Sequence, residues 1–494
     1  MGRTWRRNDD ARPLMRNERV GRWSGVALVL MTGALSCAPT ARPTPVARPV
    51  DPVTAIVGAS LWDGTGRAAV PNAVTLVRGD RVLCAGSAGE CRVPVNATVV
   101  PAAGMWLIPG LIDSHVHLLF LQRGSAGEEL GADLRDLLAQ GVTTVRDMGT
   151  DPEELLSRVA GLRYAPRVHA MQLVAGQRFF SSGRGPTVRA RGTVYRQAPA
   201  LTIRQLGWTP MLFTPGADAD SLVAEARHTG AMGLKLYAQL DQASVRALVQ
   251  AAHRVGLPVW GHAWVQPTSA LEQALAGQDG VVHAAGLAGE LFSREDRDTL
   301  VADGALQDAT AAYANRMSAH DPRVLAALDS MARLHTMFEP TLDATRHSVT
   351  HYDGLSQHRV GLQEGYVRAA VSFGVEVTRL AVARGVRISA GSDHIAYGPA
   401  SERASVFGEL ELLVDSIHLT PARALLAATR DAALAIGGPV AHEVGTIEPG
   451  RYADLVLLRQ SPLEDVHNLD SVEWVMQGGK LLRPWTLRSG IAMR

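Results

Sequence analysis

The chain has 494 residues, of which 46% are hydrophobic and 5% aromatic, and it carries 49 Lys and Arg against 48 Asp and Glu. A chain of this length and apolarity can bury a large core, which excludes disorder as a description of the whole. The net charge of +1 favours neither nucleic acid nor an anionic membrane surface, so the expected partner is a small molecule.

The first residues combine a basic segment with an apolar one. Seven arginines lie within residues 1–22, and the run from Gly25 to Cys37 is apolar. This order is typical of an export signal, so we predict a signal peptide at 1–37, followed by a Pro-rich linker at 38–52. The residues before Cys37 resemble a lipoprotein cleavage site. We expect an exported protein, periplasmic or held to the bacterial envelope by a lipid on Cys37, with a buried first helix as the alternative.

Two segments near the chain ends share a strand-like character. Residues 53–106 and 438–485 alternate short apolar runs with Gly, Asn and Asp. Short antiparallel strands joined by turns produce this pattern, so the two segments are predicted to form one small β-sandwich domain. Cys84 and Cys91 flank a turn-like stretch. A hairpin disulfide and two buried free thiols remain as alternatives.

Between these segments, residues 107–437 alternate apolar runs with helix-like stretches. One such helix is expected to begin after Asp241 as its cap and to end at Gly256. Eight strand–helix units in this length predict an α/β chain whose main domain is a (β/α)8 TIM barrel. The candidate strands are 107–115, 142–148, 167–175, 232–237, 257–262, 280–285, 336–342 and 385–393.

Side chains of metal-ligand type end several of these candidate strands. Barrel enzymes carry their chemistry at the C-terminal ends of the strands. Because strand side chains alternate, His115 and His117 are expected on one face, and Tyr237 is expected to share a face with Lys235. A single buried histidine is more often a core residue, but recurrence at successive strand ends predicts a metal site. The candidate ligands are His115, His117, Lys235, His262, His283 and Asp393.

Several sequence blocks carry a family resemblance. They are PGLIDSHVHL at 109–118, GLKLY at 233–237, GHA at 261–263, VVHAAG at 281–286, AGSD at 390–393 and GTIEPGRYADLVLL at 445–458. On these blocks the chain resembles the amidohydrolase superfamily, and within it an exported branch similar to imidazolonepropionase and the metal-dependent Xaa-Pro or Xaa-Arg dipeptidases.

The resemblance implies a binuclear metal site, expected to hold Zn²⁺. One ion would be held by His115, His117 and Asp393, and the other by His262 and His283. Lys235 would be carboxylated on its amine and would bridge the two ions.

The resemblance also implies hydrolysis of an amide bond, in a dipeptide or an N-acyl amino acid, by a hydroxide shared between the ions. Asp393 is expected to accept a proton and then deliver it to the leaving nitrogen. Tyr237 and His394 are candidate substrate contacts, with an ordinary loop histidine as the alternative for His394. Two other functions stay open: a cyclic-amide or lactone hydrolase, and a catalytically silent binding lipoprotein.

Overall fold

The computed structural model describes residues 51–119, 126–176, 187–190, 193–196, 210–292, 318–351, 364–395 and 403–489. The predicted signal peptide and the linker up to residue 50 lie outside these ranges. Residues Asp51–Arg494 group into one unit. Within the described ranges, no helix has both the length and the apolarity needed to cross a bilayer.

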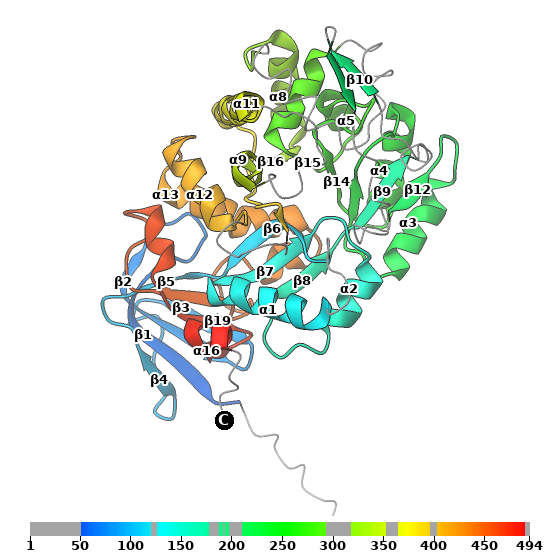
Figure 1. Ribbon diagram of the computed structural model, residues 1–494. Helices are drawn as coiled ribbons and strands as arrows, with labels where there is room; N and C mark the ends of the chain where they lie inside the picture. The colour runs from blue at the N-terminus through cyan, green and yellow to red at the C-terminus, as the bar shows by residue number, and fades with distance from the viewer. Residues whose placement is uncertain are drawn as a thin grey trace, which may run out of the picture. The chain divides into compact units, whose positions relative to one another are not determined.

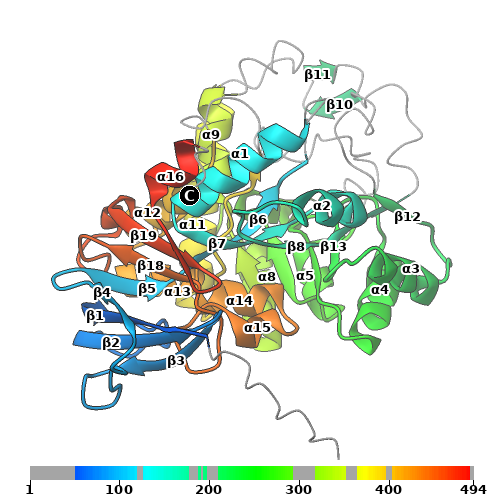
Figure 2. The same ribbon diagram turned by 90° about the horizontal axis from the view of Figure 1, so that it is seen from below.

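Both ends of the described chain contribute to one sheet, in which their strands lie side by side (Figure 2). Its order is β20-β19-β18-β5-β1-β2-β3, with β4 added beside β1. Val456 opposite Ile108 is one of the antiparallel pairs that join the two segments. The strands are β1 (Val53–Leu61), β2 (Val70–Arg78), β3 (Arg81–Gly86), β4 (Thr98–Pro101), β5 (Trp106–Pro109), β18 (Leu455–Leu458), β19 (Val472–Gln477) and β20 (Lys480–Leu482).

A disulfide joins Cys84 in β3 to Cys91, with 5.7 Å between the Cα atoms. Of the two alternatives for these cysteines, the structure therefore has the disulfide. The two-layer sandwich packing and the domain boundaries remain predictions.

The middle of the chain forms two parallel sheets, as the alternation of strand-like and helix-like segments predicts. Their orders are β17-β6-β7-β8 and β12-β9-β13-β14-β15-β16. A separate hairpin pairs β10 (Thr187–Ala190) with β11 (Thr193–Arg196). The parallel strands are β6 (Leu111–His117), β7 (Val142–Asp147), β8 (Arg167–Ala170), β9 (Gln172–Gly176), β12 (Met211–Phe213), β13 (Leu234–Leu236), β14 (Val259–His262), β15 (Gly280–Val282), β16 (Met337–Glu339) and β17 (His394–Ile395).

Two of the candidate strands are each divided between two sheets. Candidate 107–115 breaks at Gly110, where the chain leaves β5 and enters β6. A side chain at this position would clash, because an added Cβ would lie 2.1 Å from the Thr143 hydroxyl. Candidate 167–175 breaks at Met171, whose N–H donates to the carbonyl of Asp147 in β7 (2.9 Å). The strand-like sequence continues across the break in both cases, but the backbone changes its hydrogen-bonding partner.

Candidate 385–393 does not form a continuous strand. Only one isolated bridge forms there, between Ile388 and Phe338, and the short β17 follows it. The segment still makes backbone hydrogen bonds to both neighbours, from Ser389 N–H to Phe338 and from Ser114 N–H to Ala390. It ends at Asp393, whose φ of 56° falls in the left-handed region and stops the extended conformation.

Helices cover the parallel strands, and α3 and α4 lie outside β9, β12 and β14 (Figure 1). Helix α4 follows its prediction, because the Asp241 carboxylate accepts from the Ser244 N–H (2.8 Å) and Gly256 ends the helix with φ 73°. Its apolar face includes Val245 and Leu248, which are fully buried.

The helices are α1 (Ala126–Ala139), α2 (Pro152–Val159), α3 (Ala219–His228), α4 (Gln242–Arg254), α5 (Ala270–Leu275), η3 (Ala284–Leu291), α8 (Pro322–Leu334), α9 (Leu342–His351), α11 (Glu364–Ala383), α12 (Val406–Asp415), α13 (Pro421–Ala427), α14 (Arg430–Ile436), α15 (Val440–Glu443), η5 (Val466–Asp470) and α16 (Pro484–Ser489).

Candidate metal centre

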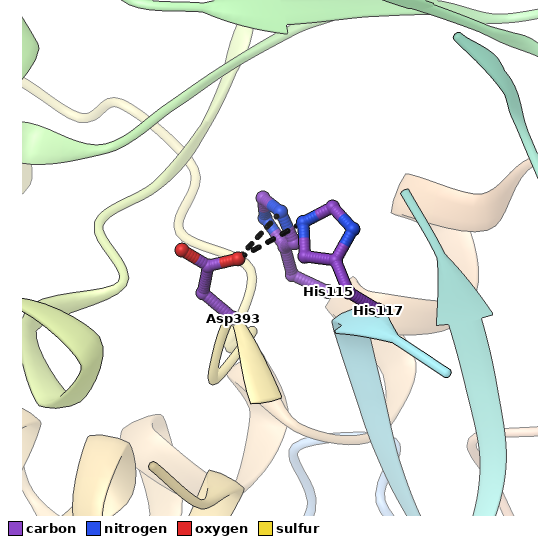
Figure 3. Close-up of side chains that lie close together, drawn as sticks. All are labelled: His115, His117 and Asp393. Atoms are coloured by element: carbon purple, nitrogen blue, oxygen red, sulfur yellow. Dashed lines mark ion pairs between the residues drawn. The ribbon is translucent and has the colours of Figure 1, made fainter. Parts of the chain in front are cut away.

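Three of the predicted ligands converge on one point. The Nε2 atoms of His115 and His117 lie 3.3 and 3.1 Å from the same carboxylate oxygen of Asp393, and Figure 3 shows the three side chains pointing toward one another. The ligand atoms of the three residues all lie within 4.8 Å of one another. Imidazole nitrogen and carboxylate oxygen are the donors that Zn²⁺ and similar ions take in proteins, so this triad fits a divalent ion.

The fold explains why the triad forms. His115 and His117 are two residues apart in β6, so both rings lie on one face, with their centroids 5.2 Å apart. The pairing of β17 with β6 sets His394 opposite Val116 and so brings the preceding Asp393 to the end of β6. Ligands almost three hundred residues apart in sequence therefore meet through one parallel strand pair.

The two remaining histidines lie beside the triad. The His283 ring centroid is 5.1 Å from that of His115 and 4.6 Å from that of His262. The Nδ1 atom of His283 lies 2.8 Å from the Thr341 hydroxyl, which leaves Nε2 as the nitrogen available to a ligand. His262 and His283 thus lie beside the triad, and the second ion remains a prediction.

Lys235 lies in β13 and is 1% exposed. Its Nζ atom has no hydrogen-bond partner among the described residues. Burial lowers the pKa of Lys235 to about 7, although the carboxylates of Glu339 and Asp393 act in the opposite direction. A buried amine without a partner is costly for a structure to retain, so Nζ is expected to have a partner outside the described residues.

The protonation states suit metal binding. Burial lowers the pKa of His115, His262 and His283 well below the ordinary value, which favours the neutral imidazole that binds metal. Burial raises the pKa of Asp393, but the contacts with His115, His117 and His283 outweigh it, and the net pKa is lower than usual. The centre therefore combines neutral nitrogen donors with an ionised oxygen donor.

Asp113 ties the backbones of two ligands together. One of its carboxylate oxygens accepts from the N–H of His115 (3.2 Å) and from the N–H of Ser392 (2.9 Å). The second contact holds the chain just before Asp393, whose left-handed backbone costs free energy unless its surroundings fix it. Asp113 was not among the sequence predictions, although it lies in the same strand as both histidines.

The two predicted substrate contacts have different surroundings. The Tyr237 ring lies 4.4 Å from the His262 ring, at the edge of the candidate centre. His394 places Nε2 at 3.1 Å from both carboxylate oxygens of Asp133, and Nδ1 at 3.1 Å from the carbonyl of Ala404. Both of its nitrogens are thus engaged within the protein. Substrate contact remains a prediction for both residues, and the contacts of His394 favour a role in fixing the chain after Asp393.

Two charged residues that sequence reasoning missed lie behind the triad. Glu339 ends β16 and places a carboxylate oxygen 2.8 Å from Nδ1 of His115. Arg146 in β7 donates to the other oxygen of Glu339 (2.9 Å). A signal was present in both cases, because Glu339 and Arg146 are charged residues inside the candidate strands 336–342 and 142–148.

Comparison with known proteins places this geometry in context. The model of the amidohydrolase family matches residues 106–482. Ochratoxinase of Aspergillus niger is 34% identical over 113 residues, which are 21% of this chain and 22% of that protein. Imidazolonepropionase of Streptomyces griseus is 31% identical over 105 residues, 20% of this chain and 26% of that protein. The matched segments thus span about a quarter or less of these relatives.

Solved structures share the fold over most of the chain. The structure of A. niger ochratoxinase has a TM-score of 0.62 at 20% identity and covers 88% of this chain and 97% of its own. A Xaa-Pro dipeptidase with bound methionine in its active site has a TM-score of 0.64 at 19% identity, with coverage of 87% and 100%.

Proposed function

The chain belongs to the amidohydrolase family, as its sequence blocks predict. On that premise we propose that it hydrolyses an amide bond of a small molecule with the help of two divalent ions, expected to be zinc. The observation that carries this proposal is the convergence of His115, His117 and Asp393, whose ligand atoms lie within 4.8 Å of one another. Those three residues would hold one ion.

The second ion would be held by His262 and His283, with Lys235 as a carbamate between the two ions. A protonated lysine repels cations, whereas its carbamate offers two anionic oxygens. The absence of a hydrogen-bond partner for Nζ among the described residues supports this assignment. So does the composition, because Lys235 and Lys480 are the sole lysines of the sequence, against 49 Lys and Arg in total. A chain that otherwise uses arginine for its positive charge keeps a primary amine at this buried position, and arginine has no primary amine to form a lysine-type carbamate.

Divalent ions bound at such a site lower the pKa of water and polarise a substrate carbonyl. Asp393 would accept the proton of the attacking water and return it to the leaving nitrogen. In the net reaction a carbon–oxygen bond forms, the carbon–nitrogen bond breaks, and a carboxylic acid and an amine are released. Tyr237, beside His262, is the proposed side-chain contact to the substrate.

We also infer that the two parallel sheets are arcs of one closed (β/α)8 barrel. The Met171 N–H bond to Asp147 links β7 to the junction of β8 and β9 (2.9 Å). On the other side, Ser389 N–H donates to Phe338 in β16 (2.9 Å), and Ser114 N–H in β6 donates to Ala390 (3.1 Å). These bonds support closure, which would bring all the ligand-bearing strand ends to one rim.

The substrate class is testable with a panel of dipeptides, N-acyl amino acids, cyclic amides and lactones. The names of the relatives, an ochratoxinase and a Xaa-Pro dipeptidase, support amides of amino acids. We expect release of an amine from at least one linear amide, with the Asp393→Asn variant as the blank for contaminating hydrolases. Turnover of cyclic amides or lactones alone would favour the alternative hydrolase. Binding without any turnover would favour a silent binding lipoprotein.

Export is proposed from residues 1–37, and the Cys84–Cys91 disulfide supports it, because such bonds persist in oxidising compartments. Contact with a membrane would then be through the lipid anchor. We expect mass spectrometry of protein from the native host to find a mature chain that begins at or near Cys37. An intact Met1 terminus in the cytosolic fraction would show that the export proposal is wrong.

A further inference from the structure

We infer that Glu339 is a positioning residue that orients His115 toward the ion of the His115–His117–Asp393 triad, and that Arg146 holds Glu339 in place for this task. The inference rests on the proposed function, since it concerns how the chain sets its affinity for metal. It assigns a role to a buried ion pair that lies outside the predicted ligand set.

The contact between Glu339 and His115 fixes which ring nitrogen faces the triad. The Oε1 atom of Glu339 lies 2.8 Å from Nδ1 of His115, while Nε2 of His115 lies 3.3 Å from Asp393. A carboxylate paired with a guanidinium has acceptors only, so Nδ1 must carry the hydrogen and donate it. Nε2 is then the nitrogen with a free lone pair, directed at the ion. Nε2 has no hydrogen-bond partner among the described residues.

Arg146 is itself held from three sides. It donates to the carbonyls of Ser114 and Ala435, both at 2.7 Å, and its guanidinium lies 4.1 Å from the centre of the Trp260 ring. Its remaining nitrogen reaches Glu339 at 2.9 Å. Because these contacts fix the orientation of the planar Arg146 guanidinium, its hydrogen bond leaves the Glu339 carboxylate little freedom to turn away from His115.

The backbone leaves room for this arrangement. A Cβ atom at Gly391 would lie 2.6 Å from Cβ of His115 and 2.7 Å from Cδ of Glu339. The glycine two positions before Asp393 therefore allows the ligand-bearing segment to pass close to the His115–Glu339 pair. The Ser114 hydroxyl adds a further hydrogen bond to Glu339 from within β6. Hydrogen-bond partners of this kind orient ligating histidines and raise their basicity.

The test is zinc affinity, measured by competition with a chromophoric chelator on the parent protein, on Glu339→Gln and on a matched control. The control is Asp454→Asn. Like Glu339, Asp454 is buried and pairs with an arginine, because Nε of Arg167 lies 2.6 Å from its carboxylate. Like Arg146, Arg167 lies over an aromatic ring, with its guanidinium carbon 3.5 Å from the centre of the Tyr452 ring. Asp454 immediately precedes β18, in the sheet of the chain ends. Loss of a buried ion pair is therefore common to both variants, and contact with a ligand is not.

We expect Glu339→Gln to bind one of the two zinc ions about 10- to 100-fold more weakly, and Asp454→Asn to bind both as the parent does. A folded Glu339→Gln protein with parental affinity for both ions would overturn the inference. If Glu339→Gln does not fold, the Arg146→Lys variant provides the test, because lysine keeps the positive charge but lacks the planar guanidinium donors. Weaker binding of one zinc ion by this variant would support the role of Glu339. Parental affinity for both ions would overturn it. A parent protein that binds no zinc would instead refute the proposed function.

Discussion

Replacement of Asp393 by asparagine is expected to lower kcat by at least about a hundredfold, the lower end of what acid–base groups contribute. Asparagine keeps the size of the side chain and one oxygen near the Nε2 atoms of His115 and His117, so the fold and much of the bound metal should remain. It cannot accept a proton at neutral pH, so the water loses its base and the leaving nitrogen loses its acid. The measurement is steady-state kinetics on the amide identified by the substrate panel.

Metal content and circular dichroism of the same preparation separate the chemical effect from loss of metal or of fold. Asp454→Asn again serves as the control, because it changes a buried aspartate outside the candidate centre and should keep kcat near the parental value. An Asp393→Asn protein that is as fast as the parent would remove Asp393 from its acid–base role.

Replacement of Lys235 by alanine is expected to remove one of the two ions and most of the activity. The side chain is 1% exposed, and its Nζ has no hydrogen-bond partner among the described residues, so alanine leaves a gap beside the histidines in place of the proposed bridge. Acetate or propionate offers the two oxygens that the carbamate would supply and is small enough to enter such a gap. We expect either acid to restore part of the metal content and part of the rate.

The sequence supplies an ideal control for this variant. Lys480 is the other lysine of the chain and is exposed in β20, so Lys480→Ala should keep two ions, full activity and no response to acetate. Lys235→Arg should resemble the alanine variant in activity, because it retains a cation and cannot form the same carbamate. If Lys235→Ala binds two ions and turns over normally, the bridge is not required, and the centre would rest on the four histidines and Asp393.

The parts of the fold and site that sequence predicted are those set by local pattern. Two-residue alternation is a property of a single strand, and it correctly brought His115 and His117 onto one face. A capping aspartate and a terminal glycine are local signals too, and they correctly bounded the helix after Asp241. The candidate ligands were found because they lie in or near the ends of the candidate strands, several of them at the last residue.

The parts that sequence did not predict depend on distant partners. The break at Gly110 arises because β5 pairs with β18 while β6 pairs with β7, and the apolar run itself does not record that change. Glu339 and His115 are 224 residues apart, so their hydrogen bond exists only once β16 and β6 are folded. The last candidate strand ends at Asp393 in a left-handed backbone conformation that its sequence neighbourhood does not reveal.

The measurement that tests the central claim most directly is the metal content of the purified mature protein, determined by inductively coupled plasma mass spectrometry alongside its activity. We predict close to two divalent ions per chain, loss of activity when a strong chelator removes them, and recovery when Zn²⁺ is returned. Metal-free protein with full activity would contradict the account, because neither the triad nor Lys235 would then have the role proposed for it.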